Sequence, residues 1–257
     1  MQLDSNILQV DNLSKYFGGL GAVSNCTLKI KKGSITGIIG PNGSGKTTLY
    51  NLNAGNLNPS GGTVLFNGEN ITNIPSYELF SKGLLRTFQI AHEFTNLTVL
   101  ENLMMVPGNQ SGEILKNALL KPKLVLEEEN KIKKKALEVI KFLNLTHLEK
   151  ELAGNLSGGQ KKLLELGRTM MVAAKIVLLD EVGAGVNRTL LKDIGSAILR
   201  LNKEKGYTFC MIEHDMDFIS RLCNPVIVIS EGSVLFEGTS DEVKTNEQVI
   251  ESYLGRR

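Results

Sequence analysis

The sequence has little net charge, few cysteines and no long hydrophobic run. Its 257 residues carry a formal net charge of +2, so no overall field draws the chain to nucleic acid or to an anionic membrane. Cys26, Cys210 and Cys223 form no CxxC pair, which argues against a disulfide framework or a zinc site and indicates reduced thiols. No segment approaches the roughly 20 apolar residues that span a bilayer, and residues 1–5 lack the regions of an export signal. We therefore expect a soluble, cytoplasmic chain that contacts a membrane only through a partner.

Short apolar runs alternate with helical patterns along most of the chain. Runs rich in β-branched residues predict strands at 7–10, 27–30, 63–66, 176–179, 207–212, 226–229 and 234–236. Residues 34–39 form a continuous apolar run of the kind that is buried in a sheet. Helical patterns follow at 46–53, 161–173, 190–203 and 216–222. The alternation argues for a mostly parallel sheet with helices on its faces.

Residues 89–155 are predicted to form a helical insert. Thr98 and Glu101 have the spacing of a capping box and predict the start of a helix that runs through Met105. Residues 127–144 place apolar side chains on one helical face and lysines and glutamates on the opposite face. The lysine cluster at 131–135 is therefore interpreted as the solvated side of an amphipathic helix, and we expect no nucleic-acid partner.

A glycine-rich loop at residues 40–47 matches the pattern GxxxxGK[ST] between a predicted strand and a predicted helix, which is the context that this motif requires. Its glycines allow successive backbone amides to point at phosphate oxygens, and the following helix presents its positive end to the same anion. Lys46 is expected to reach the β- and γ-phosphates, and the Thr47 hydroxyl to lie on Mg²⁺. The residues predicted to bind the triphosphate are Gly40, Pro41, Asn42, Gly43, Ser44, Gly45, Lys46, Thr47 and Thr48.

Two carboxylates follow the buried run at 176–179. Asp180 would lie at the end of a strand beside the loop, where it can hold Mg²⁺ directly or through water. Glu181 lies one residue further and suits the general base that activates the attacking water.

The pentapeptide Leu156-Ser157-Gly158-Gly159-Gln160 offers a second anion site. Ser157 and Gln160 have capping-box spacing at the start of a helix. A serine hydroxyl, two glycines without side chains and a helix N-terminus together can bind a phosphate. Two phosphate-binding surfaces in one chain suggest that each nucleotide is held between two copies.

Here the chain resembles the nucleotide-binding subunits of ATP-binding cassette (ABC) transporters over essentially its whole length. The loop at 40–47 is similar to their Walker A loop, the run at 176–180 to Walker B, and 156–160 to their signature pentapeptide. The resemblance implies ATP and Mg²⁺ as ligands, ATP hydrolysis, and a head-to-tail dimer in which Ser157 and Gly159 of one copy cap the γ-phosphate held by Lys46 of the other. It further implies that integral-membrane permease subunits bind the chain on the inner face of the membrane, with a solute-binding protein beyond them.

Three single residues take roles only through this resemblance. Gln89 resembles the glutamine that touches Mg²⁺ and senses the membrane partner. His214 resembles the switch histidine that bonds the γ-phosphate, and Phe17 resembles the aromatic residue that stacks on adenine, with Tyr16 as its neighbouring candidate.

One branch of the family, the ATPases of branched-chain amino acid importers, shares further features with the chain. Asn187 replaces an aspartate in that branch, and the segments 17–20, 86–89 and 252–255 are also similar to it. Val182, which replaces a proline, and Arg188 are atypical even there.

The sequence thus predicts an α/β fold: a phosphate-loop NTPase core with a mostly parallel sheet, an N-terminal antiparallel β subdomain and a helical insert. We expect one ABC ATPase domain over residues 1–257, with the core at 1–88 and 156–257 and the helical subdomain at 89–155. Three alternatives stay open: a lipid exporter ATPase, a soluble ABC ATPase outside transport, and an inactive cassette. The transported solute and the identity of the second cassette, the same chain or a related one, are also open.

Overall fold

The computed structural model describes residues 5–87, 93–108 and 110–254, which fall into two units. One unit holds the described residues of 5–87, 175–184 and 198–254, and the other those of 93–174 and 185–197. Residues 156–174 and 185–197, which the sequence assigned to the core, therefore cluster with the helical part. Close packing explains the difference: a Cβ added to Gly167 would lie 2.8 Å from Leu143 and 3.2 Å from Val139, both in that unit.

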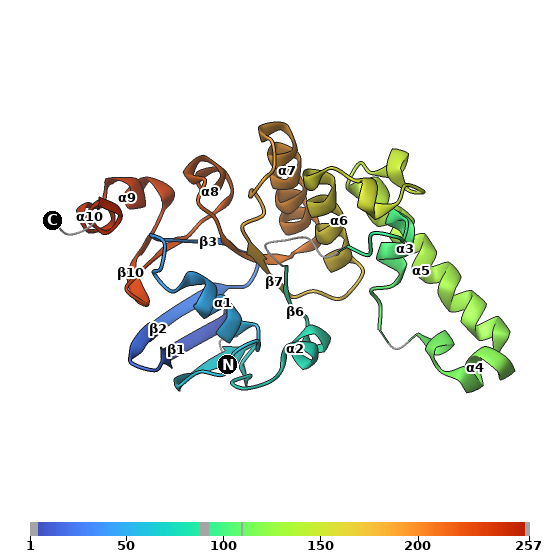
Figure 1. Ribbon diagram of the computed structural model, residues 1–257, viewed down its shortest axis with the longest axis horizontal. Coiled ribbons are helices and arrows are strands. Elements are labelled where there is room, and N and C mark those ends of the chain that lie inside the picture. The colour runs from blue at the N-terminus through green and yellow to red at the C-terminus, as the bar shows by residue number, and fades with distance from the viewer. Residues whose placement is uncertain (1–4, 88–92, 109, 255–257) are drawn as a thin grey trace. The chain divides into compact units, whose positions relative to one another are not determined.

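A six-stranded sheet organises the first unit (Figure 1). Its order is β10-β9-β3-β8-β7-β6, and only β10 runs antiparallel to its neighbour. The strands are β3 (Ile35–Ile39), β6 (Leu84–Arg86), β7 (Ile176–Asp180), β8 (Thr208–Ile212), β9 (Val226–Ser230) and β10 (Ser233–Gly238). Every residue of β3, β7 and β8 is buried, as expected for parallel strands covered on both faces. The predicted mostly parallel sheet is confirmed.

A second, antiparallel sheet of order β2-β1-β4-β5 belongs to the same unit. Its strands are β1 (Asn6–Phe17), β2 (Leu20–Lys31), β4 (Gly61–Phe66) and β5 (Glu69–Asn70). A hairpin turn at Asn67-Gly68 joins β4 to β5. β1 and β2 are far longer than the predicted runs at 7–10 and 27–30, because register shifts along the pair interrupt the alternation that sequence patterns rely on.

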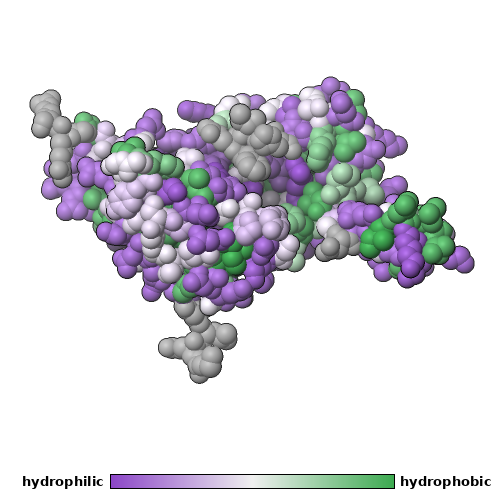
Figure 2. Space-filling view, turned by 60° about the horizontal axis from the view of Figure 1, so that its bottom comes forward, coloured by the Kyte–Doolittle hydropathy of each residue, from purple (hydrophilic) through white to green (hydrophobic). Residues whose placement is uncertain are grey.

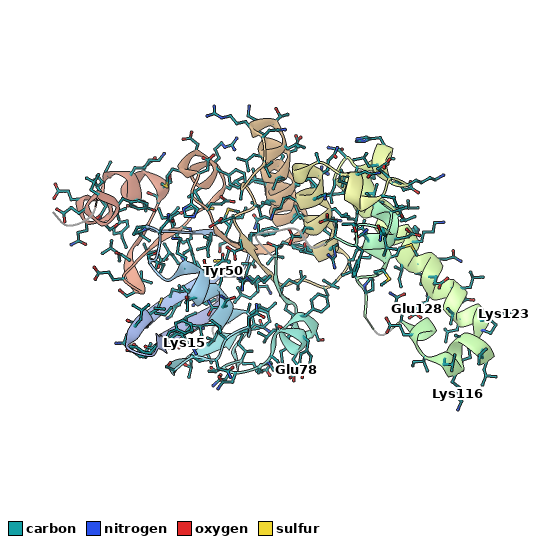
Figure 3. The ribbon with its side chains drawn as sticks, viewed as in Figure 1. Lys15, Tyr50, Glu78, Lys116, Lys123 and Glu128 are labelled. Atoms are coloured by element: carbon teal, nitrogen blue, oxygen red, sulfur yellow. The ribbon has the colours of Figure 1, made fainter. Side chains whose placement is uncertain are left out.

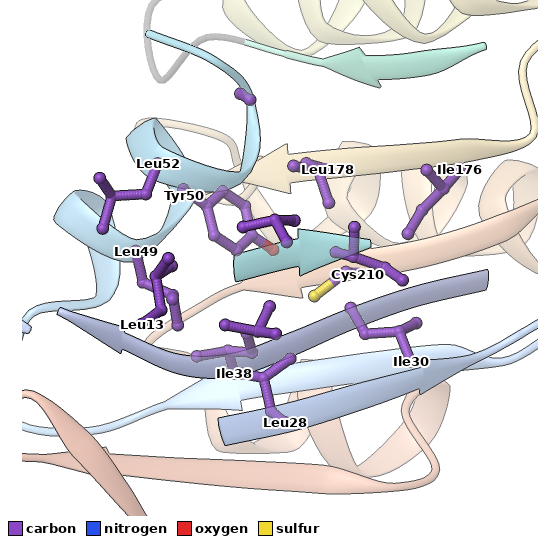
Figure 4. Close-up of a cluster of buried hydrophobic side chains, with 14 of the residues drawn as sticks. Leu13, Leu28, Ile30, Ile38, Leu49, Tyr50, Leu52, Ile176, Leu178 and Cys210 are labelled. Carbon is purple, nitrogen blue, oxygen red and sulfur yellow. The ribbon is translucent and has the colours of Figure 1, made fainter. Parts of the chain in front are cut away.

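The core of this unit lies between the two sheets. Figure 4 shows side chains of the antiparallel sheet, such as Leu13 and Ile30, with Ile38 of β3 and with Tyr50 of the helix that spans Lys46–Asn53. The helices of the unit are α1 (Lys46–Asn53), α2 (Ser76–Lys82), α8 (Met216–Leu222), α9 (Ser240–Thr245), α10 (Glu247–Leu254) and the second half of α7 (Arg188–Lys205). The helices predicted at 46–53 and 216–222 are found at those bounds.

The second unit is helical. It contains α3 (Val99–Met104), η1 (Ser111–Glu113), α4 (Leu115–Leu120), α5 (Pro122–Phe142), η2 (Thr146–Leu148), η3 (Ala153–Asn155), α6 (Gly158–Met170) and the first half of α7. The capping box predicted at Thr98 and Glu101 is present at the start of α3. α5 begins five residues before the predicted start, since Pro122 has no N–H to lose in a first helical turn. Among the described residues, no helix combines the length and the hydropathy that a bilayer span requires.

Candidate functional site

The glycine-rich loop links the C-terminal end of β3 to the N-terminus of α1, as predicted. β3 lies between β9 and β8, so the loop emerges near the middle of the sheet, where α/β folds bind their ligands. Gly45 is the N-cap of α1 in the left-handed region, with φ 98°. A Cβ there would lie 2.3 Å from the Ala22 oxygen. Glycine is therefore required at this position for both conformation and space.

Gly232 ties this loop to the rest of the unit by backbone hydrogen bonds alone. Its N–H donates to the Ser44 oxygen at 3.0 Å, and its own oxygen accepts from the Ser24 N–H at 2.9 Å. The turn between β9 and β10, the strand β2 and the phosphate loop therefore meet at one residue.

Lys46 is folded back onto the loop that precedes it. Its Nζ donates to the Gly40 and Pro41 carbonyl oxygens at 2.8 Å each and lies 3.4 Å from the Ser44 hydroxyl. The residue is buried, and burial lowers the pKa of the ammonium, an effect that the charge of Glu181 opposes. The Thr47 side chain at the next position is exposed, so the two predicted phosphate and metal contacts are presented by adjacent residues.

Gly40 provides a test of the shape of the loop. It has φ 152°, and a Cβ there would lie 2.0 Å from the Ile229 oxygen, whereas Gly43, with φ 80°, has open space around its Cβ position. Gly40→Ala should lower the free energy of unfolding by about 3 kcal/mol, because backbone must move. Gly43→Ala should lower it by about 1 kcal/mol from conformation alone. Denaturant unfolding of both variants measures the difference, and equal losses would contradict the geometry.

Asp180 ends β7, as predicted, and its carboxylate is already paired. Arg86 Nη2 lies 2.8 Å from Asp180 Oδ2, with the two side chains only 11% and 5% exposed. The other terminal nitrogen of Arg86 donates to the Asn51 side chain of α1. Thr87 adds a backbone bond from its N–H to the Leu178 oxygen at 2.9 Å. The sequence did not predict this pairing, because its partners are far apart along the chain.

The donor atoms near the loop suit a hard divalent cation. Thr47 offers a hydroxyl and Asp180 a carboxylate, and oxygen donors of this kind, completed by phosphate oxygens and water, are what Mg²⁺ prefers. No group of three or more histidine, cysteine, aspartate or glutamate side chains is arranged for a metal within the part of the chain that the structure describes. The residues therefore fit a cation that arrives with a phosphate ligand. Gln89, the third predicted metal contact, lies outside the described residues.

Glu181 and His214 lie together, from two neighbouring strands. Glu181 follows β7 in the left-handed region, with φ 48°, and its N–H donates to the Ile212 oxygen at the end of β8. His214 Nε2 lies 3.0 Å from Glu181 Oε1. The His214 side chain is half exposed and that of Glu181 is 22% exposed. The structure thus brings the predicted base and the predicted switch histidine into direct contact.

Glu213 supports the turn after Glu181. Its Oε1 accepts from the Gly183 N–H at 2.8 Å, and burial raises the pKa of its carboxyl. Val182, the atypical residue at the usual proline position, is 5% exposed and packs as part of the core. The side-chain bond from Glu213 and the burial of Val182 hold this turn without a proline.

The signature pentapeptide lies in the helical unit. Ser157 is the N-cap of α6, and the capping box with Gln160 is formed in both directions, as predicted. Gly159 is needed for packing, since a Cβ there would lie 2.6 Å from Leu190. Gly158 faces more open space, with the nearest atom at 3.7 Å. In the same unit, the Asn187 side chain accepts from the Leu190 N–H at 2.9 Å and caps α7, a role that asparagine fills well.

Phe17, the predicted adenine contact, ends β1 with 49% of its surface exposed, and Tyr16 beside it is equally exposed. Lys15 Nζ lies 5.3 Å from the centroid of the Phe17 ring. An exposed ring at a strand end is available for stacking on a flat ligand.

Comparison with known proteins extends over nearly the whole chain. A family model described as ABC transporter matches residues 23–184, and one described as branched-chain amino acid ATP-binding cassette transporter matches residues 233–257. The chain is 42% identical to a probable branched-chain amino acid transport ATP-binding protein LivG of Archaeoglobus fulgidus, over 97% of this chain and 95% of that protein. It is 35% identical to the high-affinity branched-chain amino acid transport ATP-binding protein BraF of Pseudomonas aeruginosa, over 97% and 98%.

Solved structures that superpose on this chain are also ATP-binding cassettes of ABC transporters. A nucleotide-free ATP-binding cassette from an ABC transporter superposes with a TM-score of 0.84 at 39% identity, over 98% of this chain and 100% of that one. The ADP conformation of another such cassette superposes with a TM-score of 0.83 at 36% identity, over 98% and 99%.

Proposed function

The chain belongs to the ABC transporter family, and from that premise we propose that it is the ATP-hydrolysing subunit that energises an importer of branched-chain amino acids. The observation that carries the proposal is the second family match, at residues 233–257. A general cassette model does not distinguish one cargo from another, whereas this C-terminal match belongs to a single transport branch. It also weighs against the lipid exporter and the soluble ATPase that the motifs left open.

Different residues of the first unit would bind the phosphates, activate the attacking water and stack on adenine. The loop amides of residues 40–45 and the N-terminus of α1 would hold the triphosphate, with Lys46 released from its own loop to the β- and γ-phosphates. Glu181 would orient the attacking water and accept its proton, and His214 would keep that carboxylate in position. The exposed Phe17 ring would stack on adenine.

Thr47, Asp180 and Gln89 would hold Mg²⁺ when the nucleotide binds. The cation supplies charge neutralisation for the transferred phosphoryl group. For Asp180 to contribute, its carboxylate has to share or leave the ion pair with Arg86.

Ser157, Gly158, Gly159 and Gln160 would complete the site from a second cassette. The N-terminus of α6, with its capped serine and two glycines, suits a terminal phosphate presented by another copy. We propose a head-to-tail pair of cassettes, bound to integral-membrane permease subunits on the cytoplasmic face of the membrane. A solute-binding protein would deliver the cargo on the other face.

Reconstitution tests this function. The chain, coexpressed with permease subunits of a branched-chain amino acid importer from the same organism, should copurify with them in detergent. In proteoliposomes, phosphate release should rise when leucine, isoleucine or valine is supplied with the solute-binding protein, and labelled leucine should enter the vesicles. A complex with Lys46→Ala should assemble yet transport nothing, because the phosphate contact is lost. Hydrolysis that responds to lipid, DNA or ribosomes and never to amino acids would overturn the proposal.

A further inference from the structure

Apolar side chains gather on the surface of the α4–α5 hairpin. Leu115, Leu119 and Leu120 of α4 are 75%, 72% and 70% exposed, and Ile114 just before them is 57% exposed. We call these four residues the leucine patch. Leu124 and Leu126 at the start of α5 extend it, with 45% and 59% exposure. Figure 2 shows hydrophobic surface over this hairpin, next to hydrophilic surface.

The charges within this segment have one sign. Residues 114–126 contain Lys116, Lys121 and Lys123 and no aspartate or glutamate. All three lysines are exposed, and in Figure 3 Lys116 and Lys123 project from the same hairpin as the patch. The net charge of the whole chain is close to zero, so it does not reveal this local cluster of lysines beside leucines.

Three of the acidic residues nearby line the inside of the hairpin, whereas Glu127, directly after this segment, is exposed. Glu128 Oε2 accepts from the Ser111 N–H at 2.7 Å and holds η1 against α5. Glu128, Glu129 and Glu113 also line a hollow of about 570 Å³ beside Ala118. Glu113, Glu128 and Glu129 therefore face this hollow. Within the described residues, none of them forms an ion pair with a lysine of 114–126.

α4 has no buried face that would stabilise it as a helix. None of its six residues, all of which the structure describes, is buried, and a helix of this length without a buried face is marginal in water. A partner that covers the leucines would stabilise it. The composition favours lipid over protein: interface cores are enriched in aromatic residues and arginine and depleted in lysine, whereas segments that lie in a membrane surface combine leucine with lysine.

We propose that the leucine patch inserts into the surface of an anionic lipid bilayer, with Lys116, Lys121 and Lys123 on the lipid headgroups. The patch would give this unit its own contact with the membrane, beside any contact through permease subunits. This proposal differs from the expectation that the chain meets a membrane only through a partner. The inference goes beyond the proposed transport function and does not require it.

Vesicle binding of the purified full chain tests this inference. The chain should float with vesicles of phosphatidylcholine and phosphatidylglycerol, bind vesicles of phosphatidylcholine alone more weakly, and detach as salt is raised. Leu115→Gln with Leu119→Gln and Leu120→Gln should lower the partition coefficient by about tenfold per leucine. Lys116→Glu with Lys121→Glu and Lys123→Glu should lower it by about fivefold per lysine.

Matched controls separate the patch from general effects. Leu254→Gln removes a leucine that is 80% exposed on α10 and should leave flotation unchanged. Lys131→Glu with Lys133→Glu and Lys134→Glu changes the net charge by the same amount, on exposed positions of α5 away from the patch, and should lower binding far less. Steady-state ATP hydrolysis and circular dichroism confirm that each variant is folded.

A fluorescent probe gives a second measurement. Cys26, Cys210 and Cys223 are buried, and burial raises the pKa of all three thiols, so a cysteine introduced as Leu119→Cys can be labelled selectively. An environment-sensitive dye there should shift to the blue on anionic vesicles, while the same dye at Leu254→Cys should not.

Three results would overturn the inference. The first is that the chain neither floats with anionic vesicles nor shows the spectral shift. The second is that the two triple lysine variants lose vesicle binding equally, and the third is that the patch variants bind vesicles normally but no longer copurify with membrane subunits. The last result would assign the patch to a protein partner. Because ATP hydrolysis of the detached chain is measured separately, failure here leaves the proposed transport function intact.

Discussion

Replacing Glu181 by glutamine should lower ATP hydrolysis by about 100- to 10,000-fold, which is the range that a general base contributes, while nucleotide binding is retained. Glutamine keeps the size of the side chain and its contact with His214, but it cannot accept the proton of the attacking water. ATP should therefore remain bound, and paired cassettes should accumulate. Steady-state phosphate release and size-exclusion chromatography with ATP measure the two effects.

Glu204→Gln is the control for this prediction. Glu204 lies on the exposed surface of α7 and pairs with Arg200, so its loss should leave hydrolysis within the error of the assay. If Glu181→Gln kept hydrolysis near that of the unmodified protein, the general base would have to be another group. Hydrolysis by the unmodified protein itself tests the inactive-cassette alternative.

Arg86→Ala should destabilise the protein by about 3 to 5 kcal/mol, the usual result of removing one partner of a buried ion pair. Asp180 would be left 5% exposed in its side chain with no opposing charge, and Asn51 would lose its contact with Arg86. Chemical denaturation measures the loss. Added Mg²⁺ with ATP should protect this variant more than the unmodified protein, because a cation then returns to the Asp180 carboxylate.

Arg200→Ala is the matched control for the ion pair. It removes an arginine from an ion pair with Glu204 whose side chains are about half exposed, with N and O atoms 3.3 Å apart. Exposed pairs of this kind contribute about 0.3 to 0.5 kcal/mol. Should Arg86→Ala prove no more harmful than Arg200→Ala, the buried pair would not hold the end of β7.

The parts of the site that depend on neighbouring residues could be predicted from the sequence. The loop at 40–47 and the capping boxes at Thr98 and Ser157 need only residues within a few positions of one another, and each is found where the pattern placed it. Asp180 and Glu181 could be placed because the apolar run that predicts the buried strand stops directly before them.

The features that depend on distant residues could not be predicted. Arg86 and Asp180 are separated by 94 positions, and no local pattern links an arginine at the end of one strand to an aspartate at the end of another. The leucines of α4 have the composition of a core helix, so sequence alone cannot show that they are exposed. The division of the chain into units depends on the packing of α6 against α5, which brings Gly167 close to Leu143.

Gly232 has a mechanical consequence for this molecule. Because its two main-chain bonds join Ser44 to Ser24, a shift of the phosphate-binding segment is transmitted to the β9–β10 hairpin and to β2 without any side chain in between. Mutations in the hairpin that alter its tilt should therefore change the affinity for nucleotide from outside the pocket, with Gly232 as the pivot.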